Sequence, residues 1–256
     1  MQAETASWPD WRDAAAYAPL LDADRSLFAW EWLRRDPRYR AAAEKGAGTP
    51  VAASGACAAE FGLVTFEHPC LAVPLARPVW RAESCSFVLP VDLCRGPVAA
   101  DDEIDVDRLH DLARIIADER GEHLLLSDGL RLIRLDGPPR AFTAGAVCLR
   151  YSIQGRCSAE APLLTLRRFL ALCRSGSFSN ALHRREAKAR RWIMMLRAHD
   201  AIAAGADQRR IAEWLLSRSV VEARWRTRES SVRSQVQRIV RASREISRGG
   251  YRRLLR

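Results

Sequence analysis

The chain has 256 residues, of which 48% are hydrophobic and 28% are charged, and its formal net charge is +10. This length and apolar content suffice for a buried core in one large or two modest domains, which excludes a wholly disordered chain. No stretch approaches the roughly 18 to 20 uninterrupted apolar residues of a membrane span, and residues 1–9 lack the basic start and apolar core of a signal peptide. The sequence therefore predicts a cytoplasmic protein without a membrane partner.

The charge is divided unevenly along the chain. Residues 161–256 hold 23 Arg and Lys against 7 Asp and Glu, a net charge of +16, whereas residues 1–160 hold 18 basic and 24 acidic side chains, a net charge of −6. A GC-rich genome explains why only Lys45 and Lys188 are lysines, but such a codon bias would not leave the first 160 residues acidic. A segment this basic attracts polyanions because binding releases condensed counterions, so nucleic acid is the first partner to consider.

Aromatic residues are concentrated in residues 7–44, where short helices are expected. Asp22 or Asp24 is suited to cap a helix that begins near Arg25, and Asp36-Pro37 is expected to end it. So many rings in a short segment indicate a small packed core, with a protein-docking surface as the alternative. The rings belong to Trp8, Trp11, Tyr17, Phe28, Trp30, Trp32 and Tyr39.

Two irregular segments are expected next. Residues 45–59 are rich in Gly, Ala, Ser, Thr and Pro without an apolar period, which predicts a linker that lets the parts on either side move independently. Residues 61–80 are expected to be extended, and Pro69, Pro74 and Pro78 restrict them to a sheet edge or to another surface.

Residues 85–153 have the pattern of a small mixed sheet with one helix. The helix is expected over residues 105–120, whose apolar side chains share one face at helical spacing. Asp128-Gly129 supplies the positive φ angles of a tight turn and predicts a hairpin. Strands are expected at residues 86–93, 123–126, 130–135 and 146–153.

The seven cysteines form an odd set with no C-x-x-C pair and no following His-x-x-x-His pattern. They are expected to be reduced and mostly buried, because free cysteine behaves as a small hydrophobic side chain. The sequence thus predicts no zinc site and no cofactor.

After residue 161 the apolar pattern is helical to the end of the chain. Four helices are expected, the third beginning at Asp207 and the last running from about Arg228 to a stop at Gly249-Gly250, after which Tyr251, Leu254 and Leu255 fold back onto the core. The inward side chains are expected to be Leu163, Leu166, Phe169, Leu170 and Cys173, then Trp192, Met195, Leu196 and Ile202, then Ile211, Trp214 and Leu215, and last Val232, Val236, Ile239 and Val240.

The last three helices have the order that a helix-turn-helix requires, two helices that brace and one that enters the major groove. Opposite its apolar stripe the final helix carries Arg, Gln and Ser, which are residue types that read base edges or bind phosphates. Three arginines before this helix are placed to bind the phosphate backbone of DNA. The connection over residues 216–228 is longer than the usual turn of about three to four residues, which indicates a variant motif. The expected DNA contacts are Arg224, Arg226, Arg228, Ser230, Ser231, Arg233, Ser234, Gln237, Arg238 and Arg241.

Short motifs at both ends of the chain resemble known proteins. Those in the C-terminal part are Arg190-Arg191-Trp192-Ile193, Arg197-Ala198-His199-Asp200, Ala204-Gly205-Ala206, Arg210-Ile211-Ala212, Ser231-Val232-Arg233 and Gly249-Gly250-Tyr251-Arg252. They resemble a proteobacterial family of activators and antiactivators of integrative and conjugative elements, whose variant helix-turn-helix was once described only as a domain of unknown function. Near the N-terminus, Trp8-Pro9-Asp10-Trp11-Arg12 and Trp30-Glu31-Trp32-Leu33-Arg34-Arg35 resemble the "transcriptional regulator-like" domain that precedes it in longer members.

The resemblance implies a function as well as a fold. Long members with both domains resemble activators of excision and transfer genes, whereas short members act as antiactivators that bind the activator. Both domains are present here, which favours the activator, with promoter or operator DNA, RNA polymerase and a related antiactivator as partners. Helix-turn-helix proteins commonly bind two half-sites, so a homodimer is a further expectation, and the aromatic N-terminal segment could serve recruitment or dimerisation.

We therefore expect an α+β protein in four segments: a transcriptional regulator-like helical domain at residues 1–48, a linker and Pro-rich segment at 49–84, a small α/β region at 85–160 and a basic helix-turn-helix domain at 161–256. The expected function is sequence-specific, nucleoid-associated transcription regulation. The alternative is an antiactivator-type module that binds a related regulator rather than DNA.

An enzyme is not expected. The common nucleotide-binding, metalloprotease and hydrolase motifs are missing from the sequence, and no His is followed by Arg at the third position, as a strand-transfer enzyme with Tyr251 as nucleophile would require. A lone His199 on a helix is expected to be structural, because metal ligands need partners at fixed spacing.

Overall fold

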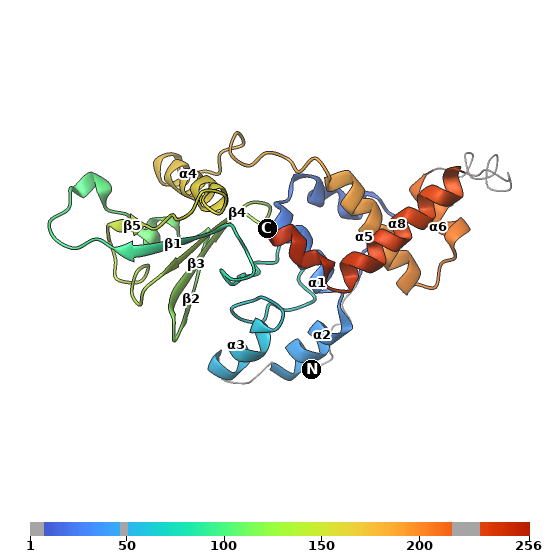
Figure 1. Ribbon diagram of the computed structural model, residues 1–256, viewed down its shortest axis with the longest axis horizontal. Helices are drawn as coiled ribbons and strands as arrows, with labels where there is room; N and C mark the ends of the chain where they lie inside the picture. Colours follow the sequence, from blue (N-terminus) through green and yellow to red (C-terminus); the bar gives the residue numbers. More distant parts are fainter. Residues whose placement is uncertain (1–7, 47–50, 217–230) are drawn as a thin grey trace.

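The computed structural model describes residues 8–46, 51–216 and 231–256. Figure 1 shows an elongated molecule with a β-sheet at one end and a group of helices at the other. The predicted α+β fold is confirmed. No helix in the described ranges combines the length and apolar character needed to cross a membrane.

The sheet is mixed and has five strands in the order β2-β3-β4-β1-β5. β1 runs parallel to β4, and the other neighbouring strands are antiparallel. Strands at four of the predicted positions are confirmed, and β2 is additional. The bounds are Val88–Leu93 for β1, Ala113–Asp118 for β2, Gly121–Ser127 for β3, Leu132–Gly137 for β4 and Leu149–Tyr151 for β5.

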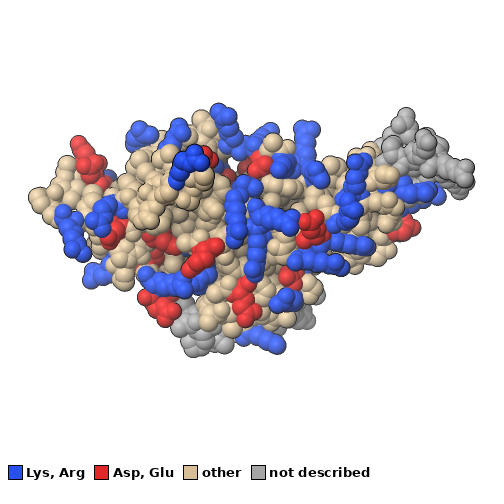
Figure 2. Space-filling view, viewed as in Figure 1, with Lys and Arg blue, Asp and Glu red and all other residues tan. Residues whose placement is uncertain are grey.

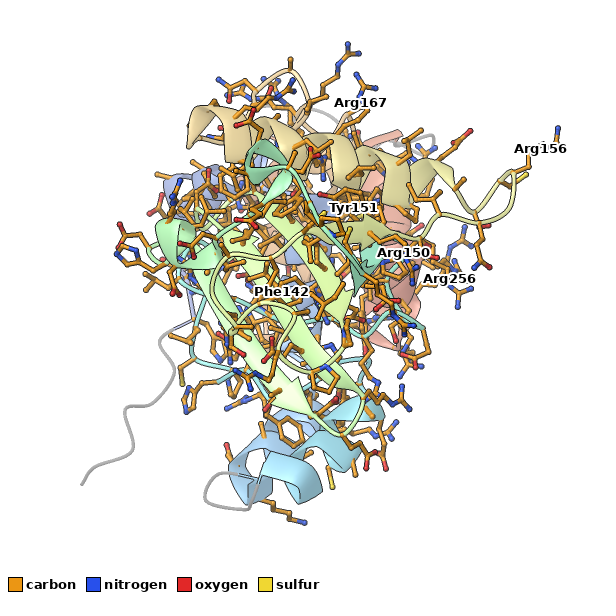
Figure 3. The ribbon with its side chains drawn as sticks, turned by 90° about the vertical axis from the view of Figure 1, so that its left-hand side faces the viewer. Phe142, Arg150, Tyr151, Arg156, Arg167 and Arg256 are labelled. Carbon is orange, nitrogen blue, oxygen red and sulfur yellow. The ribbon has the colours of Figure 1, made fainter. Side chains whose placement is uncertain are left out.

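Both faces of the sheet are apolar and both are covered. Leu124 and Leu126 of β3 face a cluster that includes Phe169 of α4 (Glu160–Ser175), while Leu125 between them faces the helices at the other end of the molecule. This alternation is the two-residue period of a strand. Figure 3, which looks onto the sheet end, shows α4 lying across the sheet.

The helical end combines the first and the last parts of the chain. Helix α1 (Arg25–Leu33) is buried along nearly its whole length and contacts α5, α8 and the C-terminal 3-10 turn η4. The C-terminal turn lies between the helices and the sheet, where Ser86 N donates to Leu255 O at 2.8 Å (Figure 1). The other helical bounds are Ala15–Asp22 (η1), Pro37–Gly46 (α2), Val51–Ala59 (α3), Ala100–Asp102 (η2), Val106–Leu109 (η3), Ala189–Ala203 (α5), Gln208–Leu215 (α6), Ser231–Ser247 (α8) and Gly250–Leu255 (η4).

Several local predictions are confirmed. The hairpin of β3 and β4 is confirmed, but its connection spans residues 128–131, and of the pair Asp128-Gly129 only Gly129 has a positive φ, of +97°. A Cβ on Gly129 would lie 2.6 Å from Pro74 O, so both the turn and the packing require glycine there. Helix α1 begins at Arg25 as expected, and most of the N-terminal rings are buried, with Trp11, Tyr17, Phe28, Trp30, Trp32 and Tyr39 in the core.

The helix predicted over residues 105–120 is wrong. Only Val106–Leu109 forms a short 3-10 turn, and Ala113–Asp118 is strand β2, paired with β3 from Ala113↔Leu126 to Asp118↔Gly121. The apolar spacing fitted a helix, but Ile115-Ile116 also favours a strand, and pairing with a fully buried neighbour decided the outcome.

The linker predicted over residues 45–59 is also wrong as far as it is described. Helix α2 continues to Gly46 and Val51–Ala59 is helix α3, because an alanine-rich segment has high helix propensity. The expected independent movement of the two ends is not supported, since one hydrophobic cluster joins Trp11, Leu27 and Trp30 to Trp192, Val236 and Leu255.

Three expectations about burial are corrected. Cys57, Cys70, Cys157 and Cys173 are exposed and only Cys85 is fully buried, so the thiols are free but not mostly buried. Leu163 and Leu170 are 49% and 38% exposed, because α4 packs on the sheet through Thr165, Phe169 and Leu172 instead. Trp214, expected to point inward, is 50% exposed and stacks edge-on against Trp11 at the surface of α6.

Candidate nucleic-acid interface

Helix α8 has one buried and one exposed face. Val232, Val236, Ile239 and Val240 are each at most 8% exposed, as the apolar stripe predicts. The opposite face is exposed to solvent throughout. It carries Arg233, Ser234, Gln237, Arg238 and Arg241.

The buried face of α8 rests on α5 and α6, and α5 also contacts α6. Helix α6 begins at Asp207, whose Oδ1 accepts a hydrogen bond from Arg210 N at 2.7 Å. Helix α8 ends at Ser247, and Gly249, with a φ of +104°, lets the chain turn back so that Tyr251, Leu254 and Leu255 are buried as predicted. The three helices and the turn therefore present the exposed face of α8 as a supported surface.

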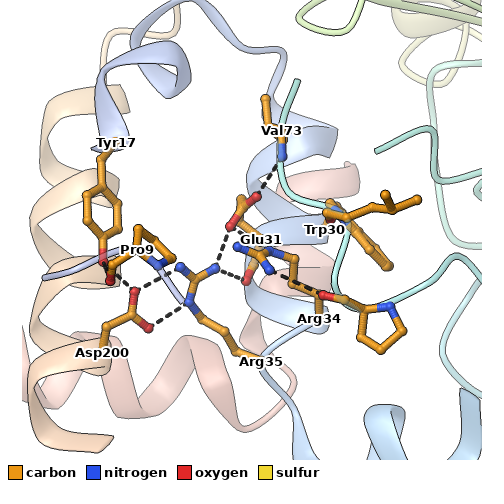
Figure 4. Close-up of polar contacts among 10 residues, drawn as sticks. Pro9, Tyr17, Trp30, Glu31, Arg34, Arg35, Val73 and Asp200 are labelled. Atoms are coloured by element: carbon orange, nitrogen blue, oxygen red, sulfur yellow. Dashed lines mark hydrogen bonds and ion pairs between the residues drawn. The ribbon is translucent and has the colours of Figure 1, made fainter. Parts of the chain in front are cut away.

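A buried ion network fixes α5 to the N-terminal helices (Figure 4). Arg35, after the end of α1, donates to both carboxylate oxygens of Asp200 on α5, at 2.7 and 2.8 Å, and to Glu31 Oε2 at 2.5 Å. Tyr17 Oη donates to Asp200 Oδ2 at 2.6 Å. Arg34 Nε completes the set by donating to Glu31 Oε2 at 2.8 Å, so two arginines balance two carboxylates away from water.

The ionised state of this network follows from its pairing. Burial alone would lower the pKa of Arg35, but Glu31 and Asp200 beside it raise that pKa above the ordinary arginine value. Burial alone would raise the pKa of Glu31, but Arg35 and Arg34 hold it below the usual range. Both groups therefore stay charged at neutral pH, and each depends on the other for compensation.

His199 lies next to this network, and its surroundings favour the structural role that the sequence predicts. Its ring packs edge-on against Trp32 at 5.5 Å, and burial lowers its pKa, which favours the neutral imidazole. Within the described residues, no group of three or more His, Cys, Asp or Glu is placed to hold a metal ion.

The predicted DNA contacts divide into three sets. The structure brings Arg233, Ser234, Gln237, Arg238 and Arg241 onto one exposed face. Ser231 begins α8, but only its backbone is described. Arg224, Arg226, Arg228 and Ser230 lie outside the described residues.

The structure adds basic residues that the sequence reasoning missed. A groove of about 960 Å³ lies beside the second half of α8 and is lined by Arg241, Arg244, Arg248 and Arg253, with Gln208 from α6 and Gln237. Glu245 is the acidic residue that lines it, and it is paired with Arg253 at 2.6 Å. Figure 2 shows Lys and Arg side chains gathered over α8 and the C-terminal turn. Arg244 and Arg248 continue the helical spacing of Gln237 and Arg241, so the same helical pattern, extended by two turns, would have found them.

Two family models match this chain. Residues 153–256 match one described as "T6SS, Transcription factor, DNA binding domain", and residues 10–64 match one described as "Proteobacterial transcriptional regulator-like domain". These domains indicate a DNA-binding transcriptional regulator. A comparison with curated proteins gave no match.

The matches place the structural features of this regulator within named domains. The C-terminal match contains all of α5, α6 and α8, and the N-terminal match contains η1, α1 and α2. The N-terminal match confirms the predicted "transcriptional regulator-like" domain. Both matched families are of the regulator type rather than of an enzyme type. The ion network of Figure 4 joins one matched domain of the regulator to the other, through Arg35 and Asp200.

Proposed function

We propose that this regulator binds duplex DNA sequence-specifically through the exposed face of α8, with α5 and α6 as the bracing helices of a variant helix-turn-helix. The observation that carries the proposal is the division of α8 into a buried Val/Ile face and an exposed face with Arg233, Gln237 and Arg241. Arg pairs bidentately with guanine and Gln with adenine, so these side chains are suited to base edges in the major groove.

The length of α8 favours a division of roles along it. Its 17 residues span about 25 Å, about twice the roughly 12 Å width of the major groove, so one helix cannot touch base edges along its entire length. Recognition helices read bases through their N-terminal residues. We therefore assign base reading to Arg233, Ser234 and Gln237, and phosphate contacts to Arg244 and Arg248 beside the groove.

Substitutions on α8 separate the two roles. Gln237→Ala or Arg233→Ala is expected to weaken binding to the preferred sequence by about 1 to 3 kcal/mol and to relax the sequence preference. Arg248→Ala is expected to weaken binding to all duplexes alike, because a phosphate contact carries no sequence information.

Selection of sequences from a random duplex pool, followed by anisotropy titrations on selected and scrambled duplexes, measures both effects. Arg174→Ala on α4, exposed and outside α8, is the matched control and should change neither. Equal losses on both duplexes for all α8 variants would place the reading surface elsewhere.

The regulated genes are a finer proposal. The motif resemblance supports activation of excision and transfer genes of an integrative and conjugative element, with RNA polymerase and a related antiactivator as protein partners and a homodimer on paired half-sites. The description of the matched C-terminal family supports T6SS genes as the competing target. Genome-wide mapping of the bound sites in the host cell distinguishes the two, and retention of protein partners without any bound DNA would favour the antiactivator-type module instead.

The four-segment division of the chain also stays a proposal. The first and last segments share one hydrophobic cluster, so the division describes ranges of sequence rather than separately moving bodies.

A further inference from the structure

A second cavity lies between the sheet and the helices, away from the exposed face of α8. It has a volume of about 500 Å³, within the roughly 300 to 1,000 Å³ range of small-molecule sites. Its walls come from the start of α1, the sheet, α4 and the segment before α5. Apolar lining is supplied by Trp80, Phe87, Leu125, Leu132, Leu164 and Leu182.

The charged lining of this cavity is strongly basic. Six arginines line it against Asp24 and Glu186, and two of the six are paired with carboxylates outside the lining, which leaves an excess of two positive charges. Arg185 is paired with Asp22, and Arg134 is paired with Asp136 at 2.6 Å, so these two are compensated. The remaining arginines are Arg25, Arg167, Arg168 and Arg184.

The inner arginines, Arg25 and Arg168, have charges that the described residues compensate only in part. The Arg168 side chain is 11% exposed; its Nε donates to Leu182 O at 3.0 Å, but its ion pair with Asp24 has an N–O distance of 3.7 Å, beyond ordinary hydrogen-bond distance. Arg25 Nε is buried, and neither it nor the buried Trp80 Nε1 has a hydrogen-bond partner within the described part of the chain. A buried donor without an acceptor costs free energy, which an incoming anion would recover.

The outer arginines stand at the rim. Arg167 and Arg184 are exposed and have no hydrogen bond or ion pair to the described residues. Arg167 projects from α4 at the edge of the molecule (Figure 3). The cavity thus combines an apolar wall, two inner cations and a rim of further cations.

We propose that this cavity binds a small organic anion with an apolar body, of the aromatic carboxylate class. The carboxylate lies against Arg25 and Arg168, because a planar guanidinium matches a carboxylate bidentately, and the apolar body packs on Trp80, Phe87 and Leu164. The lining reaches Ala187, two residues before α5, and α5 packs on α8. Such a position is suited to an effector of the regulator.

Calorimetric titration of the full chain with 1-naphthylacetate tests the site, with the uncharged 1-naphthylacetamide as the matched probe. The carboxylate is expected to bind with a sub-millimolar Kd and the amide at least about tenfold more weakly, the size of a charged hydrogen bond. Arg25→Gln and Arg167→Gln should each weaken the carboxylate, and Ala181→Trp, which fills the cavity without a change of charge, should abolish binding. Arg174→Gln should leave the Kd unchanged, because Arg174 lies on α4, as Arg167 does, but outside the cavity lining. Thermal unfolding of each variant establishes that it is folded.

Four results would overturn the proposal. The first three are no binding at millimolar concentrations, equal binding of acid and amide, and an Arg174→Gln effect equal to that of Arg25→Gln. The fourth is a loss of DNA affinity in the ligand-free Arg25→Gln and Arg167→Gln variants that is as large as the loss in the Arg248→Ala variant. Such a loss would assign Arg25 and Arg167 to the DNA-binding surface. Because the probe titrations contain no DNA, the site stands or falls independently of DNA binding by α8.

Discussion

Asp200→Ala is expected to lower the free energy of unfolding by about 3 to 5 kcal/mol, because it removes one of the two carboxylates that balance the buried Arg34 and Arg35. Glu31 then remains as the single carboxylate partner of both arginines. Asp200 accepts hydrogen bonds from Arg35 and Tyr17, and both donors would lose a charged acceptor inside the core. Chemical denaturation followed by tryptophan fluorescence and circular dichroism measures the change.

Two further variants make this test specific. Asp207→Ala removes the exposed N-cap of α6 and should cost only about 1 kcal/mol, the ordinary value of a cap. Arg35→Met combined with Asp200→Leu leaves Glu31 and Arg34 as a balanced pair, so the double variant should be more stable than Asp200→Ala alone. If Asp200→Ala cost no more than Asp207→Ala, the network would not be what holds α5 to the N-terminal helices.

Deletion of residues 1–48 is expected to abolish cooperative unfolding and DNA binding together. The deletion removes α1, whose Leu27, Phe28 and Trp30 are fully buried, and exposes the partner faces of α5, α8 and η4. Fully burying one such side chain contributes about 1.5 to 3 kcal/mol, so removing several exceeds the roughly 5 to 15 kcal/mol stability of a whole domain.

Denaturant unfolding of the truncated chain measures this directly, with anisotropy titration against DNA as the second readout. A truncated chain that unfolded cooperatively and kept its DNA affinity within a few fold would contradict the shared core. It would instead restore the interpretation of residues 45–59 as a linker between independent parts.

Much of the fold could be predicted from local patterns. The apolar stripe of α8, the hairpin at Asp128-Gly129 and the start of α1 at Arg25 each depend on neighbouring residues, and the structure confirms all three. Turn chemistry and helical period are local properties, which is why the amino-acid order alone was enough to predict them.

The failures share a physical cause, which is tertiary contact. Residues 113–118 have a helix-compatible pattern but are paired with β3. Trp214 lies on the apolar side of α6 but is half exposed, with its ring edge-on against the buried Trp11. The joining of the two ends of the chain also could not be derived from composition, since Arg35 and Asp200 are 165 residues apart. Both residues do lie in the motifs that carried the family resemblance.

The candidate site was predicted in part. The helical pattern placed Arg233, Gln237 and Arg241 on one exposed face of α8, whereas the groove of Arg244, Arg248 and Arg253 depends on how the C-terminal turn folds back. The cavity between sheet and helices could not be predicted at all, because its lining comes from segments spread over residues 23–187.

The salt dependence of DNA affinity tests the central claim most directly. Anisotropy titrations of the full chain across salt concentrations should give a steep log–log slope of about −0.9 for each phosphate contacted. Replacing Arg241, Arg244 and Arg248 with Ala should make the slope shallower by roughly 0.9 for each phosphate that the variant no longer neutralises. The control variant replaces the exposed Arg108, Arg156 and Arg174 with Ala, which removes the same charge. Its slope should stay near that of the unchanged chain. Equal slopes for the α8 variant and the unchanged chain, or an equal decrease in both variants, would contradict DNA binding by α8.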